Sequence, residues 1–377
     1  MEPFAFVYKQ LENLAMKKSV LALAVVAALA APLAAQADTI LYGSARVSVD
    51  YNDESNADAY WDVFNNDSRL GVMGSEDLGG GLSAIYQYEF GVDVTDGGNF
   101  QGNRPKFVGL KGSFGSITLG TQETPYYGVT GVTDIFNTGR SFGATSWLGG
   151  SFSGYTLNPG QDRTAASGGG SLSRLDNSIM YTSPDFNGFS AALMFSMNGS
   201  LNDAQGWSNN IDIWNISAKY SNGPFFAGVT YISLEGDQLV DAGGVPYVDL
   251  NLDQWAIGLG YSSGPFTIGF NYEQGTYNEW GLLKPTWQID YGRNTSTPWN
   301  AYLAGSYTFG NNVISAAYGQ LDTGISGQDA MENYLLGYQY NFSKRTRVWV
   351  EYIGRNADGN FFYGDQNAVS IGTRVDF

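Results

Sequence analysis

Neither cysteine nor histidine occurs among the 377 residues of the chain. Without cysteine the chain can form no disulfide, thiolate nucleophile or cysteine-ligated metal site. Without histidine it lacks the Ser-His-Asp triad, the HExxH zinc motif and the usual general base near neutral pH. The sequence therefore predicts a protein that is not an enzyme and that has no cofactor and no metal site.

Basic residues are also scarce. The chain has 19 basic and 36 acidic residues, a formal net charge of -17, whereas nucleic-acid binding requires clustered Lys and Arg. We therefore expect no nucleic-acid partner. Charged residues make up only 15% of the chain, below the roughly 25% of soluble proteins, while aromatic residues also reach 15% and 50 residues are glycine. Because the apolar residues fall in short polar-apolar alternations, this composition favours a membrane β-barrel.

One apolar run lies near the N-terminus. Residues 16–18 (MKK) are a basic start, residues 20–33 are apolar, and residues 35–37 (AQA) match a signal-peptide cleavage site. The pattern predicts a signal peptide that is cleaved after Ala37. An uncleaved anchor helix is the alternative, but this run of about 14 residues is shorter than the roughly 20 that span a membrane.

The predicted cleavage divides the chain into two parts. Met16 begins a complete signal sequence, so we expect it to be the true start of the protein. Residues 1–37 are then an N-terminal extension plus a cleaved signal peptide, and residues 38–377 form the exported domain.

The exported domain has no apolar run of transmembrane-helix length, so a membrane-spanning fold must use strands closed into a barrel. Sixteen segments alternate apolar and polar residues in the way that such strands require. They are residues 39–50, 68–78, 82–93, 104–113, 116–122, 174–182, 189–197, 211–221, 225–233, 250–262, 266–277, 299–309, 313–321, 331–342, 347–355 and 366–377.

The connections between these segments alternate strictly between seven short ones and eight long ones. The short ones are rich in Gly, Asn and Pro, as in residues 79–81 (GGG) and 222–224 (NGP), and such residues favour tight turns. We predict an all-β fold, a transmembrane sixteen-stranded antiparallel up-and-down β-barrel, with both termini at the short-turn end. That end faces the periplasm in outer-membrane barrels. A soluble β-sandwich is the alternative, although a sandwich has no reason to keep its long loops at one end.

Alternation assigns the side chains of each strand to two faces. The first strand carries an apolar set between its polar residues, and the polar set is Ser44, Arg46, Ser48 and Asp50. The last strand alternates in the same way as far as Phe377. Because the apolar face of a barrel strand meets lipid, the polar sets imply a polar lumen. A barrel of sixteen strands is too wide for side chains to fill, so we expect an aqueous channel.

Four short motifs resemble those of Gram-negative outer-membrane general porins. They are residues 68–79 (SRLGVMGSEDLG), residues 104–112 (RPKFVGLKG), residues 174–184 (RLDNSIMYTSP) and the terminal Phe377. The resemblance extends over the whole exported domain. It implies a homotrimer of barrels whose third long loop folds inward and narrows the pore, and it implies that Phe377 is an assembly signal read by the barrel assembly machinery.

The resemblance also implies a basic side of the pore that faces acidic groups on the third loop. Arginine is typical of the family at the positions of Arg69, Arg104 and Arg174. Independently, a charge on the lipid face costs about 2–4 kcal/mol at mid-membrane, which favours the lumen for these residues and for Arg46. Lys106 lies in phase with Arg104 and is predicted to join them. The alternative is that these cations only pair with carboxylates along the barrel wall.

The connection at residues 123–173 is the predicted third loop. A connection of this length without secondary structure is usually functional or disordered. We expect it to fold inward, with its acidic residues Glu123, Asp134 and Asp162 opposite the basic side. Two alternatives are an external flap and a pair of additional strands within residues 146–157, which would make a barrel of eighteen.

The sequence thus predicts an outer-membrane porin, a passive diffusion channel for small hydrophilic solutes and ions, in contact with outer-membrane lipid and lipopolysaccharide. A substrate-selective channel, for example for sugars or organic anions, is the main alternative. Its lining would be aromatic residues of the third loop, namely Tyr126, Tyr127, Phe136, Phe142 and Trp147. A non-conducting barrel adhesin that uses the acidic loops 51–67 and 234–249 is a further alternative.

Overall fold

A computed structural model describes residues 38–55, 58–97, 100–101, 104–139, 173–197, 211, 213–234, 239–240, 246–248, 252–275, 297, 299–322, 329–356 and 365–377. The predicted N-terminal extension and signal peptide, residues 1–37, lie outside these residues. In the described part of the chain, no helix is long and apolar enough to cross a membrane.

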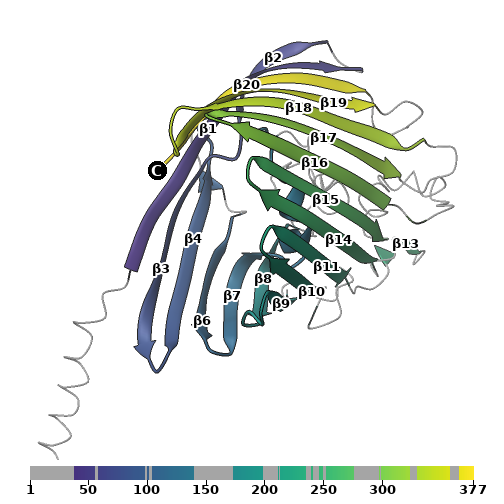
Figure 1. The fold of residues 1–377 in the computed structure, drawn as a ribbon. Coiled ribbons are helices and arrows are strands. Elements are labelled where there is room, and N and C mark those ends of the chain that lie inside the picture. Colours follow the sequence, from purple (N-terminus) through teal and green to yellow (C-terminus); the bar gives the residue numbers. More distant parts are fainter. Residues whose placement is uncertain are drawn as a thin grey trace, which may run out of the picture.

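Sixteen antiparallel strands form one closed β-barrel (Figure 1). Each strand pairs with the next one along the chain, and β1 closes the barrel by pairing with β20. The barrel strands are β1 (Asp38–Glu54), β3 (Arg69–Gly79), β4 (Leu82–Val92), β6 (Lys106–Gly112), β7 (Gly115–Glu123), β8 (Arg174–Thr182), β9 (Phe189–Ser196), β10 (Ile213–Asn222), β11 (Phe225–Leu234), β14 (Leu252–Ser263), β15 (Phe266–Gly275), β16 (Trp299–Phe309), β17 (Asn312–Asp322), β18 (Met331–Asn341), β19 (Thr346–Asn356) and β20 (Gln366–Asp376).

Shorter elements accompany the barrel within the described residues. They are β2 (Tyr60–Asn65), β5 (Phe100–Gln101), β12 (Leu239–Val240), β13 (Pro246–Val248), the α-helical turn α2 (Tyr127–Thr130) and the 3₁₀ turn η2 (Gly131–Thr133). β2 pairs with β1 and β5 pairs with β4, so both extend the barrel sheet, whereas β12 and β13 pair with each other.

The prediction of a loop at residues 51–67 is wrong for much of this range. β1 continues to residue 54, and β2 pairs antiparallel with it. The rings of Tyr51 and Trp61 contact each other across the two strands, with 5.2 Å between their centroids. Asp62 lies between Trp61 and Val63, which are both exposed on the outside. The acidic residues suggested a solvated loop, but the alternation around them is that of a strand.

Short turns join the strands at one end of the barrel and long connections at the other, as predicted. Gly223 and Gly264 have φ values of 56° and 55°, and tight turns between antiparallel strands require this left-handed conformation. Asp38 begins β1 and Phe377 follows β20, so both ends of the barrel sheet lie at the short-turn end; Figure 1 marks the C-terminus.

The two faces of the strands differ in polarity, as the alternation predicts. Large apolar side chains such as Leu303 and Ile371 are about half exposed on the outer surface, at 51% and 52%. On the inner face of the first and last strands, Ser48, Asp50 and Ser370 are buried. The outer surface therefore has the apolar character that contact with lipid requires, and the lumen is largely polar.

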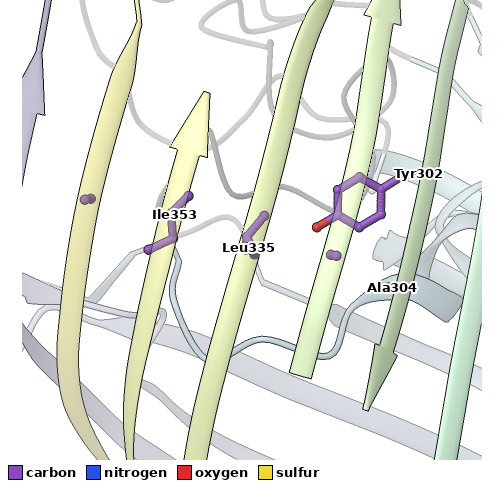
Figure 2. Close-up of a cluster of buried hydrophobic side chains, with 6 residues drawn as sticks. Tyr302, Ala304, Leu335 and Ile353 are labelled. Atoms are coloured by element: carbon purple, nitrogen blue, oxygen red, sulfur yellow. The ribbon is translucent and has the colours of Figure 1, made fainter. Parts of the chain in front are cut away.

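The lumen wall also carries one apolar patch, which alternation alone did not predict. One row of inner-face residues runs across five neighbouring strands, from β16 to β20. The patch comprises Ala304, Ala317, Leu335, Ile353 and Ala368, together with Tyr302. Figure 2 shows Tyr302, Leu335 and Ile353 on strands of this wall. Apolar surface in a wet lumen needs a cover, and Ile135 and Phe136 from the connection after β7 pack against the patch.

Candidate functional site

The connection that follows β7 lies inside the barrel. We call its described part, residues 124–139, the inner loop. Its turns α2 and η2 pack against β11, β14, β15 and β16, and its last residues reach Glu351 on β19 and Asn66 beside β3. The predicted infolding is therefore confirmed for the inner loop, and an external flap is wrong for this segment.

The pairing of the neighbouring strands limits the alternatives for the rest of this connection. β7 pairs directly with β8, from Ser116↔Thr182 to Glu123↔Arg174, which excludes an eighteen-stranded barrel with a hairpin inserted between these two strands. Residues 140–172, which contain Asp162, lie outside the described residues. The position of Asp162 opposite the basic side stays a prediction.

Tyr126 fixes the start of the inner loop to the lumen wall. Its backbone N–H donates to Asn215 Oδ1 (2.7 Å), and its hydroxyl donates to Glu273 Oε2 (3.1 Å) and accepts from Gln254 Nε2 (3.2 Å). The side chain is 1% exposed. Further along, Asn271 Nδ2 donates to the carbonyl of the last α2 residue (3.2 Å). These wall residues belong to β10, β14 and β15, so three strands hold the first half of the loop.

Glu351 on β19 fixes the other end of the inner loop. Its carboxylate accepts from the backbone N–H of Asn137 (2.8 Å), from Asn137 Nδ2 (3.0 Å) and from the backbone N–H of Thr138 (2.8 Å). The residue is 3% exposed. The backbone N–H of Gly139 donates to Asn66 Oδ1 (2.8 Å). Hydrogen bonds at both ends, with the apolar patch between them, hold the loop across the lumen.

Arginines line the arc of the lumen wall opposite this loop, and we call this arc the basic wall. Arg46 lies opposite Arg374 in the pairing of β1 with β20, and Arg374 lies opposite Arg347 in the pairing of β20 with β19. Arg69 pairs with Ser44 on the other side of β1. The basic wall thus comprises Arg347, Arg374, Arg46 and Arg69 on four consecutive strands. Our sequence prediction of the basic side included Arg46 and Arg69 but not Arg347 or Arg374, although alternation in the last strand places Arg374 on its polar face.

Partners along the wall fix the direction of these side chains. Asp376 Oδ2 accepts from Arg347 Nη2 (2.7 Å), and its Oδ1 accepts from Arg374 Nε (2.6 Å). Arg46 Nε donates to Ser44 Oγ (3.1 Å). Two arginines thus share one carboxylate, which leaves the basic wall with net positive charge.

Arg104 has a bracing role: its buried guanidinium forms ion pairs with two carboxylates of the barrel wall. Its guanidinium binds Asp67 Oδ1 (3.0 Å) and Glu89 Oε1 (3.7 Å), and its side chain is only 6% exposed. Arg69 Nη1 shares Glu89 Oε1 at 3.8 Å but is 25% exposed. Asp67 reaches Arg104 because the extended conformation is interrupted between β2 and β3, where Asp67 has a left-handed φ of 61°. For Arg104, the alternative of pairing with carboxylates along the wall therefore holds.

Arg174 and Glu123 form an ion pair at the ends of β8 and β7. Their nearest charged atoms are 4.0 Å apart, and more than half of the Glu123 side chain is exposed. Arg174 lies close enough to Arg104 and to Tyr127 of the inner loop to interact with both electrostatically. The two residues lie directly opposite each other on neighbouring strands, so this ion pair runs along the barrel wall. The position of Glu123 opposite the basic side stays a prediction.

The prediction that Lys106 lines the lumen is wrong. Lys106 pairs with Tyr88 and Thr121, in the phase of Val108, whose side chain is exposed on the outer surface. Its ammonium lies 4.9 Å from the centroid of the Phe90 ring. Arg104 and Lys106 do not share a face, because the chain at residues 104–105 precedes β6 and does not follow its alternation.

Asp134 is the acidic group that the inner loop presents to the lumen. Its side chain is exposed there, and Tyr127 donates a hydrogen bond to its Oδ2 (2.9 Å). Arg46 and Arg69 of the basic wall interact with it electrostatically. The surrounding barrel displaces bulk water and raises the pKa of Asp134 above its ordinary value, and the hydrogen bond from Tyr127 and the charge of Arg46 partly offset this rise. A carboxylate therefore faces guanidinium groups across the lumen.

We expect Arg104→Ser to destabilise the barrel without removing a charge from the open lumen. Asp67 would lose its ion-pair partner and Glu89 one of its two arginine partners, and the expected loss is about 2 kcal/mol of unfolding free energy. Urea unfolding in lipid vesicles measures it. Arg345→Ser, in the exposed turn after β18, is the matched control with an expected change of about 0.5 kcal/mol or less. Equal unfolding free energies for both variants would contradict the bracing role.

In the described part of the chain, no group of three or more acidic residues could hold a metal ion. The site is a polar passage with opposite charges on its two sides, and its geometry suits the passage of solutes. A family model described as Gram-negative porin matches residues 22–360. The chain belongs to the Gram-negative porins.

Relatives with known names agree with this assignment. The porin is 28% identical over 355 residues to the major outer membrane protein P.IB of Neisseria gonorrhoeae, covering 89% of this chain and 92% of that protein. It is 25% identical over 401 residues to an outer membrane porin protein of Bordetella pertussis, covering 96% of this chain and 99% of that protein.

Solved structures share the fold. The anion-selective porin from Comamonas acidovorans superposes with a TM-score of 0.67 at 22% identity, covering 91% of this chain and all of that one. OmpF of Salmonella typhi, solved in complex with daunomycin, superposes with a TM-score of 0.64 at 16% identity, covering 90% of this chain and 97% of that one. Family membership and the closed barrel place this porin in the outer membrane, as a passive diffusion channel.

Proposed function

We propose that small hydrophilic solutes and ions cross this porin through a water-filled passage between the inner loop and the basic wall. The observation that carries the proposal is the attachment of the inner loop inside the lumen, with Asp134 facing Arg46 and Arg69. Opposite charges on the two sides create a transverse field that orients water and polar solutes. An apolar solute gains nothing from this field and must displace oriented water, so its barrier is higher.

The residues of the passage have distinct proposed roles. Arg46 and Arg69 provide positive charge at the lumen surface, and Asp134 provides the facing negative charge. Arg174 and Glu123 pair with each other at the ends of the neighbouring strands β8 and β7. Arg104 acts indirectly, because its buried guanidinium holds the carboxylates of Asp67 and Glu89 in place.

The substrate-selective alternative loses part of its support in the structure. Tyr126 is buried against the wall and Phe136 packs on the apolar patch, so neither ring is free to stack on a sugar. The Tyr127 hydroxyl is bonded to Asp134. Phe142 and Trp147 lie outside the described residues. An aromatic path for sugars therefore has little of its predicted lining in the inner loop.

We also propose that the porin functions as a homotrimer in contact with outer-membrane lipid and lipopolysaccharide. OmpT of Vibrio cholerae, which has been solved in a trimer form, superposes with a TM-score of 0.58 at 16% identity. Phe377 extends the pairing of β20 with β1, through hydrogen bonds of 3.0 and 3.1 Å between its backbone and that of Gly43. Its side chain is exposed on the outside, where the assembly machinery could bind it before insertion.

Planar-bilayer recording and liposome swelling together test the proposed function. Purified trimers should give discrete conductance steps that rise in proportion to salt, and sugars of increasing size should enter liposomes at steadily decreasing rates. Saturable entry of one sugar would support the substrate-selective alternative instead. Correctly folded trimers without conductance steps would overturn the proposal and favour a non-conducting adhesin.

A further inference from the structure

The lumen wall beneath the inner loop carries glycines on three neighbouring strands. Gly228 on β11 pairs with Gly258 on β14, and Gly260 on β14 pairs with Gly269 on β15. All four are on the inner face. We call them the glycine seat. Glycine inside a strand weakens it, because it contributes no side-chain packing, and it often marks a close approach of another backbone.

The inner loop makes that close approach. A Cβ atom built at Gly258 would overlap the carbonyl oxygen of Val129, and one built at Gly269 would overlap the carbonyl oxygen of Val132. Both obstacles are backbone atoms, so no side-chain rotation relieves the overlap. The loop backbone therefore lies against bare strand backbone at two points.

The other two glycines of the seat contact side chains of the loop. A Cβ at Gly260 would lie 2.6 Å from Val132 Cγ2, and one at Gly228 would lie 3.0 Å from Val129 Cγ2. Val129 is fully buried by these contacts. None of the four glycines has a left-handed φ, so the nearness of the loop, and not a special backbone conformation, explains glycine at these positions.

We propose that the glycine seat determines how far the inner loop projects into the lumen and thereby the size of solute that passes; this rests on the proposed function of the passage. Larger residues on the seat would lift α2 and η2 off the wall. Carbon and oxygen atoms in ordinary contact are separated by more than 3 Å, so relief of either backbone overlap requires a shift on the order of 1 Å. Because the wall lies behind the loop, the shift is toward the open passage.

Alanine substitutions test the proposal in the full-length trimer. Gly258→Ala and Gly269→Ala should each lower the unitary conductance, by roughly 10–30%, and lower the size limit for neutral sugars in liposome swelling. Gly305→Ala is the matched control, because Gly305 lies on the outer face of β16 and its added Cβ would make only ordinary contacts of 3.5 and 3.8 Å. Conductance of both seat variants equal to that of Gly305→Ala would overturn the proposal.

A rescue experiment separates loop displacement from general damage to the barrel. Gly260→Ala should lower the conductance, and Val132→Ala in the same chain should restore it, because it removes the methyl group that the new Cβ meets. The same Val132→Ala change should not restore Gly258→Ala, whose obstacle is the carbonyl of Val129. Equal rescue of both variants, or rescue of neither, would contradict the proposed role of the glycine seat.

The position of the loop can also be measured without conduction. In a crystal structure of the Gly258→Ala trimer, the Val129 carbonyl should lie further from β14 than in the parent protein. An unmoved carbonyl would overturn the proposal that the glycine seat sets the position of the loop. If the parent trimer does not conduct, the proposed function fails, whereas this comparison still tests the seat.

Discussion

Replacement of Arg46 and Arg69 with serine shifts the ion selectivity of this porin toward cations. The two substitutions remove two fixed positive charges from the basic wall, while the negative charge of Asp134 on the inner loop is retained. A unit charge about 4 Å from a passing ion contributes about 1 kcal/mol in a water-like dielectric, which corresponds to a several-fold change in the permeability ratio. The reversal potential across a bilayer in a salt gradient measures this change directly.

The salt concentration and the position of the removed charge provide the controls for this experiment. The shift should be largest at low salt, because the screening length falls from about 30 Å at 0.01 M to about 3 Å at 1 M. Arg345→Ser removes the same charge from an exposed turn at the short-turn end and should leave the reversal potential nearly unchanged. A double variant that behaves like Arg345→Ser would show that ions do not pass close to the basic wall.

Release of the inner loop from β19 should give the second large effect. Glu351→Ala removes the acceptor for three hydrogen bonds from Asn137 and Thr138. Each buried donor left unpaired costs about 1–3 kcal/mol, so the end of the loop should leave the wall and seek water in the lumen. We expect frequent current fluctuations between conductance levels in single-channel recordings, where the parent porin gives steady steps.

Two variants control for the loss of the carboxylate. Glu351→Gln keeps one acceptor oxygen and should fluctuate less than Glu351→Ala. Glu332→Ala removes a carboxylate from neighbouring β18, where it bonds to the hydroxyl of the outward-facing Tyr318, and should leave the current steady. Steady current from Glu351→Ala would mean that the apolar patch beneath Phe136 holds the loop without help from β19.

The sequence predicted most of the barrel, because the physical requirement on each strand is simple. Lipid on one side and water on the other impose strict alternation of side chains. The alternation of short and long connections then gives the strand count and places both termini at the short-turn end. The sequence does not predict β2, because the acidic residues near Trp61 favour a solvated loop, although Tyr51 and Trp61 alternate with polar residues as barrel strands do.

The site was less predictable, because its geometry depends on contacts between distant segments. Arg46 was placed correctly by its phase within a long regular strand. Lys106 was misplaced because the phase of β6 is interrupted next to Arg104, and a one-residue slip reverses the face of a side chain. The roles of Glu351 and of the glycine seat had no local signal, since they arise only where the inner loop meets strands that are distant in the sequence.

A single cysteine at Asp134 provides the most direct test of a passage bounded by the inner loop. The chain contains no other cysteine, so a thiol-reactive methanethiosulfonate reagent would modify Asp134→Cys alone. If the inner loop borders the narrowest section, modification with a bulky reagent should lower the unitary conductance strongly, and a reductant should restore it. Complete modification, verified by mass spectrometry, with unchanged conductance would contradict the account, because ions would then cross without passing the inner loop.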